Sequence, residues 1–209
     1  MKVIEFFAGS RSLGKVAKRM GHQVFSTDIE PFGGIDYVVD IMDFRYTKVP
    51  FVPDVLWFSP PCTGFSVASI PYNWAYNKRG VLLPISETAK VGIMLLDKTI
   101  RIINHYQRIN PKLIFWIENP RGMMRKMPQL RRFKRHTVSY CQYGDTRMKP
   151  TDLWTNSTKF KAKFCHNGAP CHIAAPRGSR TGTQGLDDAF ERSKIPALLC
   201  RDILKSSQN

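Results

Sequence analysis

The stretch DVLWFSPPCTGFS at residues 54–66 decides the fold, because it joins a short apolar run to a polar loop containing two prolines. Residues 54–58 have the length and composition of a buried strand. Pro60 and Pro61 fix the backbone and stiffen the loop, which places Cys62 near the carboxyl end of that strand. A structural cysteine usually lies within an apolar run. This position therefore favours a reactive thiol, provided that something lowers its pKa.

The same pattern, an apolar run followed by polar or glycine-containing residues, recurs on both sides of this stretch. The other predicted strands are 2–7, 23–27, 37–39, 113–117, 137–141 and 153–155. Helical spacing predicts helices at 13–20, 87–109 and 195–205. Strands that alternate with helices indicate an α/β fold with a mixed, mostly parallel sheet flanked by helices.

Side chains that suit a nucleoside cofactor follow the first three predicted strands. Gly9 permits a tight turn and the close approach of a ligand. Asp28 follows the second strand and could accept hydrogen bonds from ribose hydroxyls, and Asp40 follows the third and could accept from an adenine amine. Ligands of open α/β sheets bind outside the carboxyl ends of the strands, so these three strand ends indicate a binding site.

A second candidate catalytic group follows the predicted strand at 113–117. Glu118 is a carboxyl group at a buried strand end, where its pKa tends to be raised. When protonated it can donate a hydrogen bond to a ring nitrogen, and when ionised it can accept one from an amine. Cytosine presents both partners, at N3 and N4. Pro120 fixes the turn that follows.

These motifs, in this order, resemble those of the cytosine-C5 DNA methyltransferase family. The matching stretches are FFAG at 6–9, the acids at 28–30, DI at 40–41, SPPCTGFS at 59–66 and IENP at 117–120. The resemblance implies a Rossmann-like, S-adenosylmethionine-dependent methyltransferase fold, with S-adenosyl-L-methionine as cofactor and DNA as substrate. The chain resembles compact bacteriophage members more than the enzymes of restriction-modification systems.

The resemblance also implies roles for individual residues. Cys62 would attack C6 of a cytosine flipped out of the duplex, Glu118 would hold N3 and N4, and Arg147 matches an arginine of the catalytic pocket. Flipping is needed because C6 cannot be reached inside the base stack, and a nucleophile is needed to make C5 carbanion-like. The implied cofactor pocket consists of Phe7, Ala8, Gly9, Asp28, Ile29, Asp40, Ile41, Ser59 and Pro61. The implied substrate contacts are Pro60, Ser66, Asn119, Pro120, Arg177 and Arg180.

The chain departs from the family pattern in two places. The residues after Gly9 are Ser10, Arg11 and Ser12, where the family normally has more glycine. Ser193, a candidate cofactor contact, stands in a C-terminal segment that lacks the usual Gly-Asn. The predicted units are a catalytic core at 1–155, a short basic insert at 156–192 as target-recognition region, and a C-terminal helix at 193–209 that returns to the core. Because the insert is short, the recognised sequence would be short, the specificity relaxed, or the specificity supplied by a partner chain.

Charge and composition narrow the range of partners. The chain has 209 residues and carries 32 Lys and Arg against 16 Asp and Glu, a net charge of +16. This excess favours a polyanion, with double-stranded DNA as the expected partner and RNA left open. No apolar run is long enough to span a membrane, and no secretory signal opens the chain. With five cysteines, an odd number, we expect a reducing cytoplasm in a prokaryotic or phage-infected cell.

Three other functions fit parts of the sequence. An RNA cytosine-C5 methyltransferase would share every catalytic residue. An amino-methyltransferase would share Ser59-Pro60-Pro61, but it needs an aromatic residue where Cys62 stands. A catalytically silent nucleic-acid-binding module could keep the fold. Retention of both Cys62 and Glu118 argues against that module, because it has no chemical need for the pair.

Three segments outside these motifs allow two interpretations each. Cys165-His166 and Cys171-His172 offer zinc ligands, but the spacing is not a common finger pattern and adjacent residues rarely reach one metal. The sequence therefore predicts no metal there. The basic run at 125–135 is typical of a solvated face or a phosphate-binding surface. Residues 74–79 suit a lid over the substrate or an exposed loop.

Overall fold

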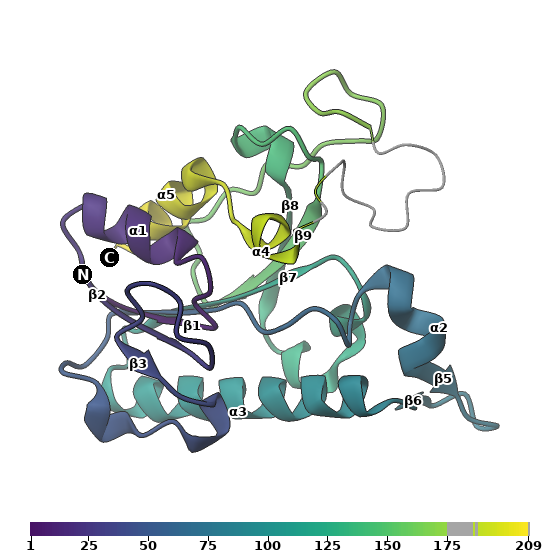
Figure 1. Cartoon of the computed structure of the whole chain (residues 1–209), viewed down its shortest axis with the longest axis horizontal. Coiled ribbons are helices and arrows are strands. Elements are labelled where there is room, and N and C mark those ends of the chain that lie inside the picture. Colours follow the sequence, from purple (N-terminus) through teal and green to yellow (C-terminus); the bar gives the residue numbers. More distant parts are fainter. Residues whose placement is uncertain (175–185, 187, 209) are drawn as a thin grey trace.

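A seven-stranded sheet forms the centre of the molecule, with strand order β3-β2-β1-β4-β7-β9-β8 (Figure 1). The computed structural model describes residues 1–174, 186 and 188–208. The strands of the sheet are β1 (Lys2–Phe6), β2 (Gln23–Asp28), β3 (Tyr37–Val38), β4 (Val55–Phe58), β7 (Ile114–Pro120), β8 (Lys134–Ser139) and β9 (Pro150–Thr155). A separate hairpin consists of β5 (Trp74–Tyr76) and β6 (Leu82–Pro84).

Strands β3, β2, β1, β4 and β7 run parallel, so their carboxyl ends meet at one edge of the sheet. The register aligns Phe6 of β1 with Phe58 of β4, and Phe58 with Ile117 of β7. β9 pairs antiparallel with both β7 and β8. Both faces of the sheet are covered, which explains why β1 and β4 are almost continuous apolar runs.

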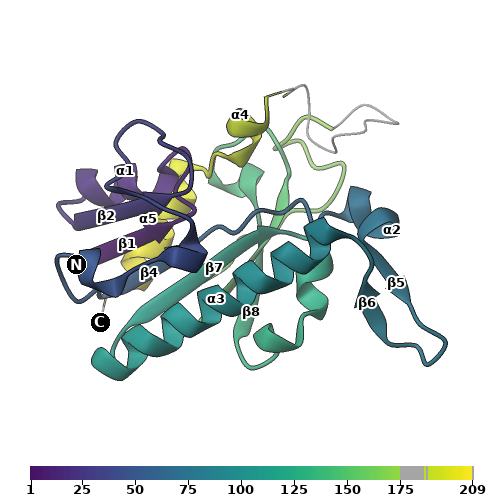
Figure 2. The same ribbon diagram turned by 60° about the horizontal axis from the view of Figure 1, so that its bottom comes forward.

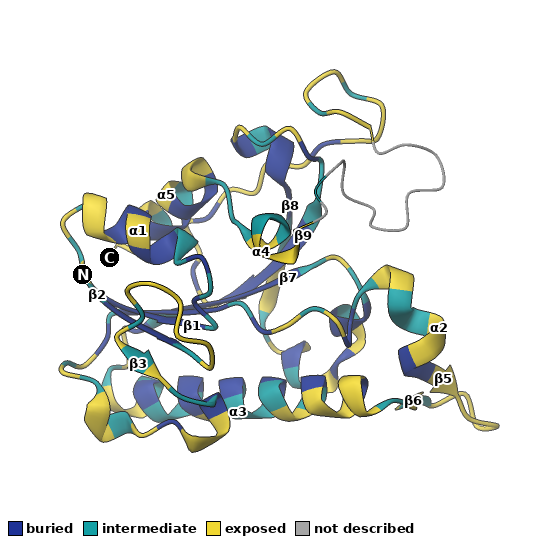
Figure 3. Ribbon diagram, viewed as in Figure 1, coloured by how far each residue is buried: buried dark blue, intermediate teal, exposed yellow. Residues whose placement is uncertain are grey.

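Helices cover the two faces unequally. The helices α1 (Ser12–Arg19) and α5 (Ala197–Ser206) pack against each other on one face, and α3 (Glu87–Ile109) lies along the other (Figures 1 and 2). Figure 3 shows that the inward sides of these helices and the sheet between them are buried. The shorter helices are α2 (Ile70–Asn73) and α4 (Ala189–Ser193), and the 3-10 turns are η1 (Ile41–Asp43), η2 (Tyr46–Lys48), η3 (Val67–Ser69), η4 (Met123–Lys126), η5 (Pro128–Leu130) and η6 (Tyr140–Tyr143).

A buried carboxyl group of the sheet binds the backbone N–H groups at the start of α1. Glu5 of β1 accepts hydrogen bonds from the backbone N–H groups of Leu13 and Gly14, each at 3.0 Å. The side chain of Arg11 makes no capping hydrogen bond, so Glu5 takes the place of an N-cap. A side chain at position 14 would displace the Glu5 carboxylate, because a Cβ there would overlap it. Burial raises the pKa of Glu5 to about 7.

The sheet differs from the sequence prediction at its antiparallel side. β7 continues to Pro120, because β9 pairs with its last residues and aligns Glu118 with Leu153. Glu118 and Asn119 therefore lie inside a strand and not after it. β8 covers Lys134–Ser139 in place of the predicted 137–141, and Tyr140 begins a 3-10 turn. Among the described residues, no helix combines the length and apolar content needed to cross a bilayer.

Candidate active site

Cys62 lies in a tight turn beyond the carboxyl end of β4. Its backbone carbonyl accepts hydrogen bonds from the N–H groups of Phe65 at 2.9 Å and Ser66 at 2.8 Å. The side chain is half-buried and its thiol is free. The turn leaves the sulfur at the sheet edge where the parallel strands end, which is the position predicted for a nucleophile.

The end of β7 holds this loop at both of its sides. The buried side-chain amide of Asn119 donates to the carbonyl oxygen of Pro60 at 2.9 Å. On the other side of Cys62, the backbone N–H of Met123 donates to the carbonyl oxygen of Phe65 at 2.7 Å. Gly122 makes this contact possible, because a Cβ there would overlap the Phe65 carbonyl. Asn119 therefore positions the Cys62 loop, and its predicted contact with substrate stays a prediction.

The segment proposed as a lid contributes a third support. The buried indole of Trp74 donates to the carbonyl oxygen of Gly64 at 2.7 Å, and Asn73 donates to the carbonyl oxygen of Thr63 at 3.0 Å. The next residues project away as the β5–β6 hairpin (Figure 2), where Tyr76 is 67% exposed. Trp74 is thus an anchor of the Cys62 loop, and a lid role for the rest of the hairpin stays a prediction.

Glu118 lies inside the sheet with its carboxyl group buried. The hydroxyl of Tyr140 donates to its Oε1 at 3.1 Å, and Ser59 also hydrogen-bonds the carboxyl group. Burial raises the pKa of Glu118, and the nearby Lys149 ammonium opposes that shift without cancelling it. The carboxyl group is therefore protonated more readily than that of an exposed glutamate.

Glu118 acts electrostatically on Cys62. Burial raises the pKa of the Cys62 thiol, and the negative charge of Glu118 raises it further. Lys149 has the opposite effect on the thiol pKa. The three groups, from the ends of β4 and β7 and from the turn before β9, form one coupled titrating cluster at the carboxyl edge of the sheet.

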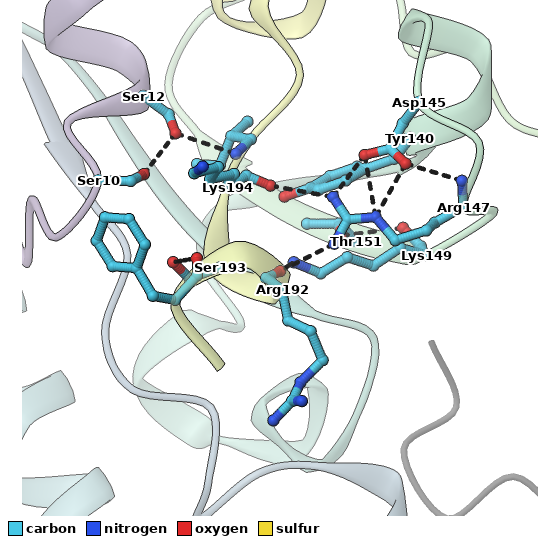
Figure 4. A network of polar contacts seen from close by, with 12 residues as sticks. Ser10, Ser12, Tyr140, Asp145, Arg147, Lys149, Thr151, Arg192, Ser193 and Lys194 are labelled. Atoms are coloured by element: carbon cyan, nitrogen blue, oxygen red, sulfur yellow. Dashed lines mark hydrogen bonds and ion pairs between the residues drawn. The ribbon is translucent and has the colours of Figure 1, made fainter. Parts of the chain in front are cut away.

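Lys149 is the residue that the sequence interpretation missed. Its backbone has a positive φ of 26°, and its ammonium donates to the carbonyl oxygen of Arg192 at 2.7 Å (Figure 4). The ammonium also lies 4.7 Å from the centre of the Tyr140 ring. Burial lowers the pKa of Lys149, while Glu118 raises it. The signal in the sequence was a second basic residue two positions after Arg147.

Arg147 is buried, and its charged partner is Asp145 and not Glu118. Its guanidinium binds the Asp145 carboxylate, with Nε 2.9 Å from Oδ1, and also donates to the carbonyl oxygen of Arg192 at 3.2 Å (Figure 4). The desolvation cost of burying these two charges is offset by their mutual attraction. In this arrangement Arg147 ties the loop after η6 to the C-terminal segment. Its predicted catalytic role stays a prediction.

The loops after β1 and β2 form the predicted cofactor edge. Gly9 donates its N–H to Oδ2 of Asp28 at 2.8 Å, and Glu30 donates to Oδ1 at 3.0 Å. The backbone is left-handed at Phe7, Gly9 and Arg11, with φ values of 52°, 45° and 56°. Left-handed backbone is unusual for residues other than glycine and clusters at functional sites.

The other predicted cofactor residues lie at the same sheet edge. Asp40 caps η1 by accepting from the N–H of Met42 at 2.8 Å, and Ile41 beside it is buried. Ile29 is 60% exposed at the end of β2. The Ser59 hydroxyl accepts from the indole of Trp57 at 2.7 Å. Each residue's contact with a cofactor stays a prediction.

The C-terminal segment lies beside the loop that follows β1 (Figure 4). The N–H of Ile195 donates to the Ser12 hydroxyl at 3.1 Å, and the Ser12 hydroxyl lies 2.8 Å from that of Ser10. Ser193 donates its hydroxyl to the carbonyl oxygen of Phe190 at 2.7 Å. The segment that was expected to return to the core is thus hydrogen-bonded to the loop after β1.

One curated protein matches almost the whole chain. It comes from Frog virus 3 (isolate Goorha), is described as a probable DNA (cytosine-5)-methyltransferase, and is 32% identical over 219 aligned positions. The alignment covers 95% of this chain and 97% of that protein. The chain belongs to the DNA (cytosine-5)-methyltransferase family. The relative is viral and similar in length, as expected for a compact member of this family. Comparison with profiles of protein families finds no match.

A solved methyltransferase shares the fold of this cytosine-5-methyltransferase. The Entamoeba histolytica methyltransferase EhMeth superposes with a TM-score of 0.51 at 14% identity, covering 79% of this chain and 57% of that one. The S. pombe Dnmt2 methyltransferase gives 0.48 at 15% identity, covering 78% and 52%. The chain therefore spans a little over half the length of these solved proteins. The predicted Rossmann-like methyltransferase fold is confirmed.

Some of the expected nucleic-acid contacts of this family member also make contacts within the protein, and two cannot be placed. Arg177 and Arg180 lie outside the described residues. Ser66 forms a bridge with Gly122, and Pro120 ends β7. In the basic run at 125–135, Arg125 makes an ion pair with the buried Asp152, so it stabilises the sheet and is not free to bind phosphate.

The cysteines and histidines of the insert gather in a way that the sequence interpretation did not predict. Three of the four candidates, Cys165, Cys171 and His172, lie together with Cys141. His166 is not part of this cluster, and its side chain is exposed. Cys141 comes from η6, which is why the spacing within the insert did not reveal the group.

Proposed function

We propose that this protein is a DNA cytosine-C5 methyltransferase that uses S-adenosyl-L-methionine and forms a covalent bond between Cys62 and its substrate base. The observation that carries the proposal is the coupled cluster of Cys62, Glu118 and Lys149 at the carboxyl edge of a methyltransferase sheet. Amino-methyltransferases need an aromatic side chain where this cluster has a thiol.

The loops after β1 to β4 have the chemistry of an adenosine site. A half-buried acid, Asp28, stands beside the exposed apolar side chain of Ile29, which suits ribose hydroxyls and an adenine face. Around Gly9 there is open space, because a Cβ at that position would meet no atom within 4 Å. Phe7, Asp40 and the loop before Cys62 complete the proposed pocket. When bound, the cofactor supplies the methyl group.

The chemistry proposed for Cys62 begins with loss of its thiol proton to solvent. The sulfur then forms a bond to C6 of cytosine, and the electron pair of the C5=C6 bond moves into the ring. Protonated Glu118 donates to N3 and stabilises this charge. After C5 has received the methyl group, its proton leaves to a base, the C5=C6 bond reforms and the sulfur–C6 bond breaks. Cys62 is thereby regenerated.

The coupling between the two groups gives substrate binding a role in activating the thiol. In the free protein, burial and the charge of Glu118 raise the pKa of Cys62. A cytosine that hydrogen-bonds the protonated Glu118 through N3 keeps this carboxyl group uncharged. The thiolate then forms beside a neutral acid and the Lys149 cation. Attack is thus favoured only when a base occupies the pocket.

The proposed substrate is a cytosine flipped from double-stranded DNA. The net charge of +16 supports binding to a polyanion. The ring must leave the stack before Cys62 can reach C6. We assign target recognition to the insert at 156–192, with a core at 1–155 and a C-terminal helix at 193–209. A partner chain that supplies further specificity is part of the same proposal.

The test is methyl transfer from radiolabelled S-adenosyl-L-methionine to DNA and to RNA, with Cys62→Ser alongside. We expect 5-methylcytosine in DNA with the wild type, and no product with the variant. Label in RNA only would keep the chemistry and overturn the substrate. Label on an exocyclic amine would overturn the mechanism. Absence of label with folded protein that also fails to bind the cofactor would indicate a silent binding module.

A further inference from the structure

We propose that Cys141, Cys165, Cys171 and His172 form a structural zinc site that fastens the insert to the catalytic core. The three sulfur atoms and a ring nitrogen of His172 all lie within 4.8 Å of one another. Three cysteines and one histidine are a common ligand set of structural zinc. This site is separate from the methyltransferase site and does not depend on the proposed function.

The distances within the cluster correspond to the edges of a small tetrahedron. Cys165 Sγ lies 3.2 Å from Cys171 Sγ, and Cys171 Sγ lies 3.6 Å from Cys141 Sγ. Nδ1 of His172 is 3.7 Å from the sulfur atoms of both Cys165 and Cys171. Tetrahedral zinc, with Zn–S about 2.3 Å and Zn–N about 2.0 Å, places sulfur atoms about 3.8 Å apart and sulfur and nitrogen about 3.5 Å apart.

The backbone holds the two segments of the cluster in place independently of any metal. The N–H of Cys165 donates to the Ser139 hydroxyl at 3.0 Å, and the N–H of Ile173 donates to the carbonyl oxygen of Thr146 at 2.9 Å. These bonds lie on either side of the loop that carries Cys171 and His172. The loop reverses direction at Gly168, whose φ is 84°. These backbone hydrogen bonds therefore bring the ligands together without a metal.

A neighbouring side chain supports a thiolate at the exposed end of the cluster. The amide Nε2 of Gln142 donates to Cys171 Sγ at 3.2 Å. Hydrogen bonds from outer residues typically orient the ligands of a metal and tune their basicity. A disulfide is the other chemistry open to close cysteines, but the 3.2 Å between Cys165 and Cys171 is well beyond a sulfur–sulfur bond of about 2.05 Å.

The position of the cluster explains what a metal would do. Cys141 lies in η6, directly after Tyr140, whose hydroxyl binds the catalytic Glu118. The other three ligands belong to the insert. A zinc ion would thus join the start of the insert to the turn that supports Glu118, in place of the larger core that this short segment cannot build. Zinc would stabilise the insert and leave the coupled cluster unchanged.

The experiment measures zinc in the full chain, purified from zinc-supplemented medium under reducing conditions, by elemental mass spectrometry. We expect about one zinc per chain, as for a closed four-ligand site. Cobalt(II) titrated into the chelator-treated protein should give the absorption bands of tetrahedral thiolate coordination. Hydrogen exchange at the N–H of Ile173 should speed up after chelation and slow down again when zinc is restored.

His172→Asn and His166→Asn are matched variants of two histidines in the same segment. His172→Asn should weaken zinc binding by at least about tenfold, whereas His166→Asn should bind zinc as the wild type does. Equal loss in both variants would contradict the assigned ligands. If the reduced wild type, titrated with zinc, binds far less than one equivalent, or if Cys165 and Cys171 prove to be a disulfide in the native protein, the proposal is overturned. Methyl transfer is assayed separately, so its failure would leave this result standing.

Discussion

Replacing Asn119 by alanine should impair catalysis without touching any reacting group. The amide of Asn119 donates to the carbonyl oxygen of Pro60 at 2.9 Å, and Asn119 is fully buried. This bond joins β7, which carries Glu118, to the loop that carries Cys62. Its loss frees the loop to sample positions in which the sulfur and the carboxyl group no longer face the same base.

The magnitude follows from the buried carbonyl that the substitution leaves unpaired. An unsatisfied buried acceptor costs about 1–3 kcal/mol. If that energy is needed to hold the loop in its active position, kcat should fall about 5- to 150-fold, since about 1.4 kcal/mol corresponds to a factor of ten.

The chain contains a matched control. Asn110 makes the same kind of bond, from its side-chain amide to the carbonyl oxygen of Pro53 at 2.9 Å, at the opposite end of β4. Steady-state methyl transfer and urea unfolding should be measured for Asn119→Ala and Asn110→Ala together. We expect both to lose stability and only Asn119→Ala to lose kcat. A wild-type kcat in folded Asn119→Ala would refute the positioning role.

Three more predictions concern titration and packing. Glu5 has a pKa of about 7 in the folded protein against 4.5 in the unfolded chain. The folded state is therefore more stable when Glu5 is protonated. Its contribution to the free energy of unfolding should therefore fall by about 3 kcal/mol as the pH rises through this window, and an unchanged pH slope in Glu5→Gln would contradict this. Lys149→Met should raise the pKa values of Cys62 and Glu118, because the Lys149 cation lowers both. The acidic limb of the pH–rate profile should then move to higher pH, whereas Lys149→Arg should leave it in place. Identical profiles for the two variants would exclude Lys149 from the cluster. Gly122→Ala should lower stability by about 1–3 kcal/mol and reduce kcat, because its Cβ overlaps the Phe65 carbonyl; full activity would show that the loop tolerates the shift.

The parallel half of the sheet and its polar edge were predictable from the sequence for a physical reason. Strands buried on both faces are short apolar runs, and polar residues directly follow them at the edge where ligands of such sheets bind. The positions of Asp28, Asp40 and Cys62 at this edge were predicted in this way, and the helix at Glu87–Ile109 has the predicted bounds. Local composition carries this information because each feature involves only a few consecutive residues.

Features that depend on distant pairing were not predictable. Glu118 lies within β7 because β9, far along the chain, pairs with it. Cys141 joins the insert cysteines only through the fold, and Trp74 supports the Cys62 loop from a segment that resembled an exposed loop. Lys149 was missed because its role comes from its proximity to Cys62 and Glu118 and not from its neighbours in sequence.

The most direct test of the mechanism is to trap the covalent intermediate. A fluorine at C5 cannot leave as a proton, so DNA containing 5-fluorocytosine should hold the enzyme at the methylated adduct when S-adenosyl-L-methionine is present. We predict a denaturation-resistant complex whose cross-linked peptide contains Cys62 and which does not form with Cys62→Ser. A complex joined through another residue, or methylation of ordinary cytosine DNA without any trapped complex, would contradict nucleophilic catalysis by Cys62.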